Sequence, residues 1–399
     1  MIPATAIATE RKFLSHSIAT GGLLRSLGAE ALNLQNPVEA TALLAAAQRH
    51  GVAPLLHRAL LQAEMRLPEP TWQQLSDFVR QNMVRNLQLS RELVRLLRLL
   101  KQQGVTAVPY KGPAMAAALW GGLDLRQCAD IDLLVRPQNV ACAAAAMVEA
   151  GYHAAAPMDR AQLERHVRSA AELQFAGADA GSLVELQWRI VPRCFAVELE
   201  LGDLWPRITA AQLGGESVPA LADEDLLLVL CVHGWKHAWA RLMWVADVAQ
   251  LLQTRPLDLG AVWAEAQHRR LRRILLLGML LAKKEFGAEL PAAALEQISR
   301  QPEVSKLAEE TVARHRAQFG GELRYSEWQG CMLRTRDSWR DRARQMAGFA
   351  FTPGLGEQAM LRLPRALAPL YVAVRAGRLS ARAARTAWAS LRGHKPART

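Results

Sequence analysis

Apolar residues recur every three or four positions over the first quarter of the chain. The spacing is clearest in VEATALLAAAQRHGVAPLLHRALLQ (38–62) and in LSRELVRLLRLLKQQG (89–104), where Gly104 closes the segment. This period is typical of helices that bury one face, and a closing glycine commonly marks a helix end. We therefore expect helices over residues 1 to about 104.

The pattern changes between Val105 and about residue 198. Short runs rich in strand-forming residues follow one another there, namely VTAVPY, ADIDLLV, AELQFA and LVELQWRIV, with an Ala-rich helix, VACAAAAMVEA, among them. β-Branched and aromatic residues favour strands, and the alternation fits half-buried ones. We expect an α+β segment with a small mixed sheet.

The helical period returns at about Leu199. It persists through LLLVLCVHGWKHAWARLMWVADVAQLL (226–252), which predicts one long helix, and through amphipathic segments around Trp263 and Leu275. A break at FTPGLGEQ precedes a basic amphipathic stretch near the end of the sequence. These changes predict an N-terminal helical region, an α+β core, a helical domain and a basic helical C-terminal region, bounded as 1–104, 105–198, 199–332 and 333–399.

Composition places the chain among ordinary globular proteins, because 51% of its residues are hydrophobic and 22% are charged. The net charge of +12 is unevenly spread. Residues 333–399 contain 14 basic and three acidic residues, so this stretch alone carries +11. We expect the basic C-terminal region to contact an anionic surface or an acidic partner, whereas the nearly neutral remainder gives no such indication.

The five cysteines are scattered without a CxxC pair, which favours reduced thiols over a disulfide framework or a zinc ribbon. The first residues lack the basic and apolar segments of a secretory signal. The longest apolar runs are far shorter than the ~20 residues that cross a bilayer. We expect a cytoplasmic protein without a transmembrane segment.

Two carboxylates in ADIDLLV are the most informative candidates for chemistry. Alternate residues of a strand point to one face, so Asp130 and Asp132 project together while Ile131 and Leu133 turn toward the core. Two like charges on one face repel unless a cation neutralises them. Paired oxygen ligands suit Mg²⁺ or Mn²⁺, and Mg²⁺ usually completes its shell with water and nucleotide phosphates. The pair predicts a metal site.

Upstream, Lys111-Gly112-Pro113 ends a short strand and opens a helix, and Pro113 suits the first helical turn. Free N–H groups at a helix start attract phosphate, and Lys111 adds positive charge, so Lys111 and Gly112 are candidate nucleotide-binding residues. Arg126 is a further candidate, because it lies in a turn shortly before the carboxylates; it could reach a phosphate or pair with Asp124.

A second group of candidates lies on the predicted long helix. A period of ~3.6 residues places five polar side chains on one side of an otherwise apolar cylinder: His233, Lys236, His237, Arg241 and Asp247. If this stripe faces the sheet, then Lys236, His237 and Arg241 could bind the triphosphate and sugar of a nucleotide. The alternative is a solvent-facing stripe with an internal ion pair.

The order strand, glycine turn, helix and then Asp-x-Asp on the next strand resembles the polymerase-beta-type nucleotidyltransferase fold. The sequence pattern KG…LWG…LR…DIDLLV most resembles the family of uncharacterised bacterial nucleotidyltransferases. The resemblance continues into LVELQWRI and HGWKHAWARLMWVADVAQLL, and it therefore spans roughly residues 49–252. The resemblance implies a polymerase-beta-like nucleotidyltransferase core between helical segments. It also implies that Asp130 and Asp132 bind the metal and that Gly112 lies at the phosphate loop.

The resemblance further implies a third carboxylate, a metal ligand and catalytic residue, which falls on Glu185. Glu172 has a similar setting, but the family's third acid lies in E-L-x-W, which only Glu185 satisfies because Trp188 follows it by three. The chain departs from the family pattern in two places. Pro113 stands where the superfamily usually has Ser or Gly, and Gln187 stands where the family often has His.

We therefore predict a metal-dependent nucleotidyltransferase that moves a nucleoside monophosphate from an NTP to a hydroxyl-bearing acceptor and releases pyrophosphate. By resemblance, the acceptor is a small molecule, a glycan or a peptide, because family members are met beside polysaccharide and peptide natural-product pathways. The alternative is a non-catalytic nucleotide-binding or scaffold protein that retains the fold, which Pro113 and Gln187 favour. A third reading, a nucleic-acid-binding accessory, rests on the basic C-terminal region alone.

Overall fold

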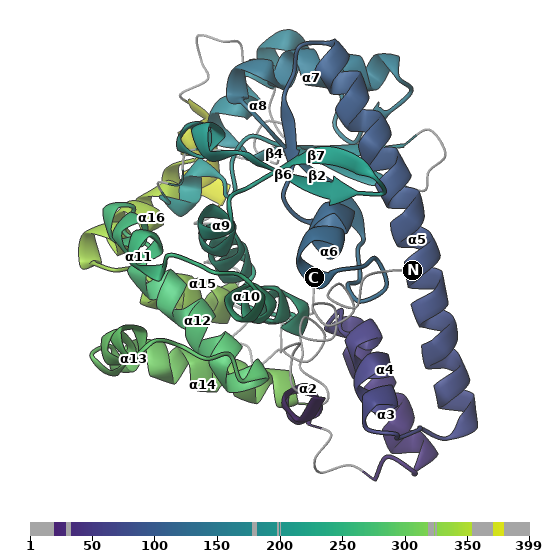
Figure 1. The fold of residues 1–399 in the computed structure, drawn as a ribbon. Coiled ribbons are helices and arrows are strands. Elements are labelled where there is room, and N and C mark those ends of the chain that lie inside the picture. The colour runs from purple at the N-terminus through teal and green to yellow at the C-terminus, as the bar shows by residue number, and fades with distance from the viewer. Residues whose placement is uncertain are drawn as a thin grey trace, which may run out of the picture.

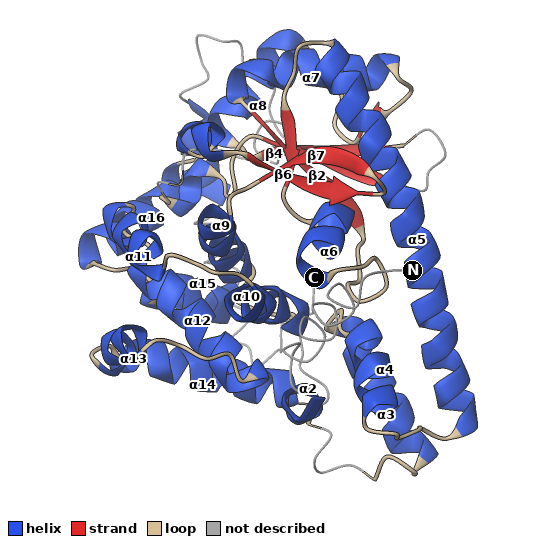
Figure 2. Ribbon diagram, in the orientation of Figure 1, coloured by secondary structure: helices blue, strands red, loops and turns tan. Residues whose placement is uncertain are grey.

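Five short strands form one mixed sheet, with helices packed around it (Figures 1 and 2). They are β1 (Ala107–Pro109), β2 (Asp130–Val135), β3 (His153–Ala154), β4 (Glu172–Ala176) and β5 (Leu183–Gln187). Their order is β1-β2-β5-β4-β3, in which β2 and β5 are parallel and the other neighbours are antiparallel. The predicted α+β class with a mixed sheet is confirmed.

The structure is a computed structural model. It describes residues 20–28, 33–177, 182–197, 199, 201–317, 323, 325–352 and 370–378. The helices before the last strand of the sheet are α2 (Thr20–Ser26), α3 (Pro37–Arg49), α4 (Ala53–Gln62), α5 (Glu69–Gln102), α6 (Gly112–Trp120), α7 (Val140–Glu149) and α8 (Arg160–Ser169). Those after it are α9 (Asp223–Lys236), α10 (Leu242–Thr254), α11 (Leu259–His268), α12 (Arg272–Phe286), α13 (Ala292–Ser299), α14 (Pro302–Arg316), α15 (Tyr325–Arg334) and α16 (Trp339–Phe351). Short 3-10 helices are η2 (Pro137–Asn139), η3 (Arg193–Phe195), η4 (Leu201–Asp203) and η5 (Trp205–Arg207).

The long helix α5 connects two hydrophobic cores. Its 34 residues span about 51 Å at 1.5 Å per residue, and Figure 1 shows it running from α3 and α4 to the sheet. Near its start, Trp72 and Leu75 are buried in the helical core. Near its end, Leu93 and Leu96 are buried with the sheet and α7. The predicted helical segments 38–62 and 89–104 are confirmed as α3, α4 and the end of α5.

The predicted single helix over 226–252 is wrong, because the chain turns between α9 and α10. Ala238 and Trp239 have φ angles of 50° and 55°, in the left-handed region that ends a helix. The turn folds the Trp239 indole back onto α9, where a Cβ on Gly234 would lie 2.4 Å from the ring. Only glycine at position 234 leaves room for this indole, so the break depends both on Gly234 in α9 and on Trp239 in the turn.

A hairpin interrupts the region that we expected to be helical from residue 199. It consists of β6 (Thr209–Leu213) and β7 (Glu216–Ala220), joined by Gly214 and Gly215 with φ angles of 59° and 84°. Positive φ at both turn residues matches the twist of paired strands. The hairpin contacts α6 and β1, so it packs beside the sheet. From residue 223 to 316, the expected helices are present as α9 to α14.

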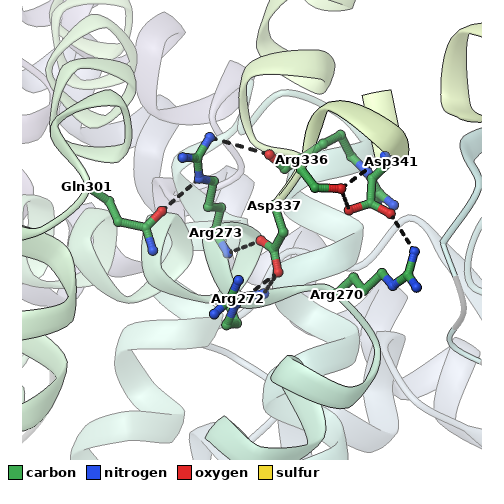
Figure 3. A network of polar contacts seen from close by, with 8 residues as sticks. Arg270, Arg272, Arg273, Gln301, Arg336, Asp337 and Asp341 are labelled. Atoms are coloured by element: carbon green, nitrogen blue, oxygen red, sulfur yellow. Dashed lines mark hydrogen bonds and ion pairs between the residues drawn. The ribbon is translucent and has the colours of Figure 1, made fainter. Parts of the chain in front are cut away.

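Polar contacts join the C-terminal helices to α12 (Figure 3). The Asp337 carboxylate accepts hydrogen bonds from the backbone N–H groups of Arg272 and Arg273, at 3.2 and 2.9 Å, and so caps the start of α12. Arg270 pairs with buried Asp341 on α16 at 3.1 Å. Residues 370–378 are helical, whereas most of the predicted FTPGLGEQ break and the rest of the basic stretch lie outside the described residues.

Candidate active site

A cavity of about 320 Å³ lies where β2, β5, the start of α6 and the turn between α9 and α10 meet. All of the predicted site residues except Lys236 line it. They are Lys111, Gly112, Arg126, Asp130, Asp132, Glu185, His237 and Arg241. The topology thus gathers residues that lie up to 130 positions apart in the chain, and the role of each stays a prediction.

The sheet register brings the carboxylates together. Asp132 pairs with Glu185 across the parallel strands β2 and β5, and Asp130 lies two residues earlier on β2. Residues two apart on a strand share a face, so all three carboxylates point into the same cavity. Glu172 instead pairs with Gln187 and does not line this cavity.

Asp132 is the most buried of the three carboxylates, with 2% exposure. Its Oδ1 accepts from the Lys111 ammonium at 2.9 Å and from the Gln187 amide at 2.8 Å. Its Oδ2 is buried without a hydrogen-bond partner among the described residues. Burial alone would lower the pKa of Lys111, but the charges of Asp132, Tyr110 and Asp130 together outweigh burial and raise that pKa above its ordinary value.

Glu185 is held by two amides. Gln174 donates to Oε1 at 3.0 Å and Gln187 donates to Oε2 at 2.8 Å. Burial, followed by the Asp132 and Glu172 carboxylates, raises the pKa of Glu185 from 4.5 to about 7. Burial and then Asp132 likewise raise the pKa of Asp130. Burial is thus the main reason why the charged forms of Glu185 and Asp130 are disfavoured, and the neighbouring carboxylate adds to it.

Gln187 is a site residue that our sequence reasoning noted only as a departure from the family. Its amide nitrogen bridges Asp132 and Glu185, and its carbonyl oxygen accepts from the buried Tyr110 hydroxyl at 2.7 Å. The residue thus fixes the distance between two carboxylates. Its position, two after Glu185 on the same strand face, is the signal that could have identified it.

The start of α6 approaches the carboxylates closely. Gly112 has a φ of +60°, and a Cβ there would lie 3.0 Å from the carbonyl oxygen of Asp130. Lys111 is the extended residue before the helix, and Pro113 lies in its first turn, as predicted. The free N–H groups of a helix start therefore border the cavity beside Lys111.

Arg126 lines the cavity, but its guanidinium is engaged elsewhere. Its Nε and Nη2 donate to the Asp247 carboxylate on α10, each at 3.0 Å, and Trp120 donates to the same carboxylate at 2.9 Å. Arg126 and Asp247 are 6% and 1% exposed. The protein partner of Arg126 is thus Asp247 and not Asp124, whereas a contact of Arg126 with a phosphate stays a prediction.

Aromatic rings also line the cavity. The rings of His233 and His237 lie 4.9 Å apart, and His237 lies 4.9 Å from Trp244, with Arg241 near the same indole. Burial, then Lys236 and Lys111, lowers the pKa of His237 to about 3. Both imidazoles are therefore neutral near pH 7.

Lys236 lies outside this cavity. It lines a second cavity and pairs with Glu172 at 3.7 Å. Because the chain turns after α9, Lys236 and His237 face different cavities although they are adjacent in sequence. Asp247 lines neither cavity and pairs with Arg126, so the predicted polar stripe is divided.

The residues present fit a divalent cation only in part. Among the described residues, no three His, Cys, Asp or Glu side chains are arranged to hold a metal together. Asp130 and the partnerless Oδ2 of Asp132 nevertheless offer two carboxylates to one cavity. Two carboxylates suffice for Mg²⁺ when water and phosphates complete its shell. Glu185 as a third ligand stays a prediction.

A sequence model of the uncharacterised nucleotidyltransferase family matches residues 36–287, which is more than half of the chain. The chain belongs to this family. The match confirms the predicted resemblance and extends beyond residues 49–252 at both ends. The matched part of the chain includes every residue of the candidate site and ends directly after α12.

Other comparisons add little. No curated protein matches the sequence of this chain significantly. The solved structure of an antigenic nucleotidyltransferase-like protein from Paracoccidioides brasiliensis is 12% identical, over 56% of this chain and 92% of that chain, with a TM-score of 0.31. No helix in the described part of the chain is both long and apolar enough to cross a membrane.

Proposed function

We propose that this protein transfers a nucleoside monophosphate from an NTP to a hydroxyl-bearing acceptor, with release of pyrophosphate. The observation that carries the proposal is the convergence of Asp130, Asp132 and Glu185 on one cavity that the start of α6 also borders. Carboxylates for a cation and N–H groups for phosphate are the two requirements of an NTP site.

The cavity offers complementary groups for a nucleotide. Lys111 and the first N–H groups of α6 would bind the β- and γ-phosphates, because both are positive and lie beside the carboxylates. Arg241 is exposed at the cavity edge and adds a second cation. The neutral rings of His237 and Trp244 would pack against the sugar or base.

In the proposed reaction, the acceptor oxygen attacks the α-phosphorus, and the bond from this phosphorus to the bridging oxygen of pyrophosphate breaks. Glu185 would accept the hydroxyl proton, because it borders the cavity and a base works best with a pKa near the working pH. Gln174 and Gln187 would keep its carboxylate oriented. Asp130 and Asp132 would hold Mg²⁺ or Mn²⁺, which when bound would offset negative charge on the phosphates.

One observation favours the second candidate, a non-catalytic nucleotide-binding protein. The Lys111 ammonium and the Gln187 amide both contact Oδ1 of Asp132, so protein groups already offset part of the charge that a cation would offset. A protein of this kind would bind NTP without depending on metal and would release no pyrophosphate. The two candidates therefore differ in a measurable way.

The test is calorimetric titration of each NTP into the full chain, with MgCl₂ or with EDTA. We expect affinity to fall more than about tenfold when the metal is removed, because two carboxylates then repel the triphosphate. Asp130→Asn/Asp132→Asn should lose this metal dependence. Asp77→Asn/Glu309→Gln removes two charges at exposed positions and is the matched control.

Three results contradict the proposal in different ways. Equal NTP affinity with MgCl₂ and with EDTA favours the non-catalytic candidate. Unchanged metal dependence in a folded Asp130→Asn/Asp132→Asn variant places the metal elsewhere. A parent protein that binds none of the four NTPs is not a nucleotidyltransferase of this kind. Circular dichroism on every variant checks that the fold is retained.

A further inference from the structure

A second and larger cavity, of about 510 Å³, lies beside β4, the strand that pairs with β5 on the side away from β2. It is bordered by β4, the end of α8, the segment around η3 and the end of α9. Small or apolar side chains form most of its wall, among them Ala155, Ala156, Ala170, Ala171, Met158 and Pro192. Cavities of this size and lining typically bind small molecules.

The two cavities are linked through Glu185. Gln174 lines the second cavity, pairs with Glu185 in the sheet and donates its amide hydrogen to Oε1 at 3.0 Å. The other carboxylate oxygen of Glu185 contacts Gln187, which contacts Asp132 of the first cavity. A ligand hydroxyl that displaced the Gln174 amide would therefore sit directly on Glu185.

The charges in the second cavity favour an acidic ligand. Lys236 and Arg375 contribute two positive charges against the single negative charge of Glu172. The Lys236 ammonium lies 3.7 Å from Glu172, which is longer than a hydrogen bond. A ligand carboxylate or phosphate could therefore take a closer position on Lys236 at little cost.

We infer that this second cavity binds the acceptor, and that the acceptor is a small molecule with an apolar body, a hydroxyl group and one acidic group. The inference rests on the proposed function. The hydroxyl would lie at Gln174 and Glu185, and the acidic group would lie at Lys236. Lys236 therefore serves the acceptor rather than the triphosphate, which departs from our sequence-based prediction.

The experiment uses two probes that differ only in charge, 4-hydroxybenzoate and its neutral amide, titrated into the full chain and followed by ligand-observed NMR. We expect 4-hydroxybenzoate to bind more tightly than the amide. Lys236→Gln should weaken the benzoate about tenfold or more and leave the amide unchanged. Lys101→Gln, at a lysine of a different cavity, is the matched control.

A filling variant tests the cavity itself. Ala155 is exposed on the cavity wall, so Ala155→Trp can fill the space without disturbing the core. It should abolish binding of both probes and leave NTP affinity unchanged. Ala141→Trp, at an exposed position on α7, should change neither. Equal benzoate affinity in the parent, Lys236→Gln and Ala155→Trp overturns the inference.

The remaining outcomes separate this inference from the proposed function. A parent that binds Mg²⁺–NTP but neither probe, up to ~10 mM, overturns the acceptor cavity and leaves the proposed function standing. A parent that binds the benzoate but no NTP overturns the acceptor role together with the proposed function. Loss of NTP affinity in Lys236→Gln, with benzoate binding retained, would show that Lys236 binds the nucleotide and not the acceptor.

Discussion

At the scale of single residues, the site depends on side-chain amides that donate hydrogen bonds to neighbouring carboxylates and so reduce their repulsion. Gln187 donates to both Asp132 and Glu185, and Tyr110 orients Gln187 in turn. Without such donors, carboxylates on paired positions of adjacent strands would repel, since like charges directly opposite destabilise a sheet. The pattern D-I-D predicts that two carboxylates share a face, but it cannot show which distant side chains stabilise them.

Glu185 and Glu172 provide a direct test at this scale. Glu185→Gln should keep Mg²⁺–NTP bound and lower turnover by ~10²–10⁴-fold, the usual loss when a general base is removed. Glu172→Gln should change turnover by less than about tenfold, because Glu172 lies beyond Gln187 and outside the nucleotide cavity. The measurement is pyrophosphate release with a saturating acceptor or with water.

Either of two results would reverse the assignment of Glu185. Equal losses in both variants would mean that the two strands share the catalytic step. A loss confined to Glu172→Gln would move the base to β4. Calorimetric titration of Mg²⁺–NTP into both variants measures nucleotide affinity, so that a loss of turnover can be distinguished from a loss of binding.

At the scale of elements, local sequence predicts most strands and helices but not their interruptions. The hairpin at residues 209–220 does have a local signal, because Gly214-Gly215 lies between two runs of strand-forming residues. The turn after α9 has none: HAWAR contains neither glycine nor proline. Trp239 adopts a left-handed φ because packing against Gly234 and Gly278 outweighs the cost, and those contacts are tertiary.

In the candidate site, too, some residues can be predicted from local sequence, whereas others depend on tertiary contacts. Asp130, Asp132 and the Lys-Gly-Pro helix start follow from local alternation and helix-start chemistry, so the residues alone predict them. Glu185 depended on family resemblance, because the register of β2 against β5 is set by contacts more than 50 residues apart. The partner of Arg126 lies 121 residues away, so its ion pair could not be predicted from the sequence.

Two side chains of α14 hold the turn between α9 and α10. Arg314 donates to the Ala238 carbonyl at 2.8 Å, and His315 Nε2 lies 2.6 Å from the Trp239 carbonyl. His315 Nδ1 lies 2.8 Å from buried Glu285 on α12. Both ring nitrogens thus face oxygen atoms, so His315 links buried Glu285 to the turn. An element outside the family match therefore positions a turn of the candidate site.

We expect His315→Leu to lower the free energy of unfolding by about 1–3 kcal/mol, because it leaves the buried Glu285 side chain without its hydrogen-bond partner. Glu285→Leu/His315→Leu should cost less than the two single variants together, since neither side chain is then left without its partner. Urea unfolding of the parent and the three variants measures this coupling. Additive costs, or a His315→Leu cost below about 1 kcal/mol, would show that the pair does not support the turn.

At the scale of the whole molecule, His50 lies where the N-terminal helices meet the later ones. Its carbonyl accepts from the backbone N–H of Met243 at 3.1 Å, at the start of α10, and its ring lies edge-on to His315 at 5.5 Å. Its Nδ1 is buried without a partner among the described residues. Burial, followed by the charges of His315, Arg49 and Arg241, lowers the pKa of His50 from 6.5 to about 4.

This depressed pKa predicts how the stability of the whole protein depends on pH. Below pH 6.5 the unfolded chain takes up a proton at His50, whereas the folded protein does so only near pH 4. The contribution of His50 is therefore fully present above pH 6.5 and is lost as the pH falls toward 4, by about 3 kcal/mol in total. Removing the imidazole should therefore make the free energy of unfolding less dependent on pH in this range.

The measurement is urea unfolding from pH 7 to 4.5. The free energy of unfolding should decline less for His50→Gln than for the parent, with exposed His153→Gln as the control. If the free energy of unfolding declined as steeply in His50→Gln as in the parent, the contact between the N-terminal helices and the later ones would tolerate a charged His50 ring.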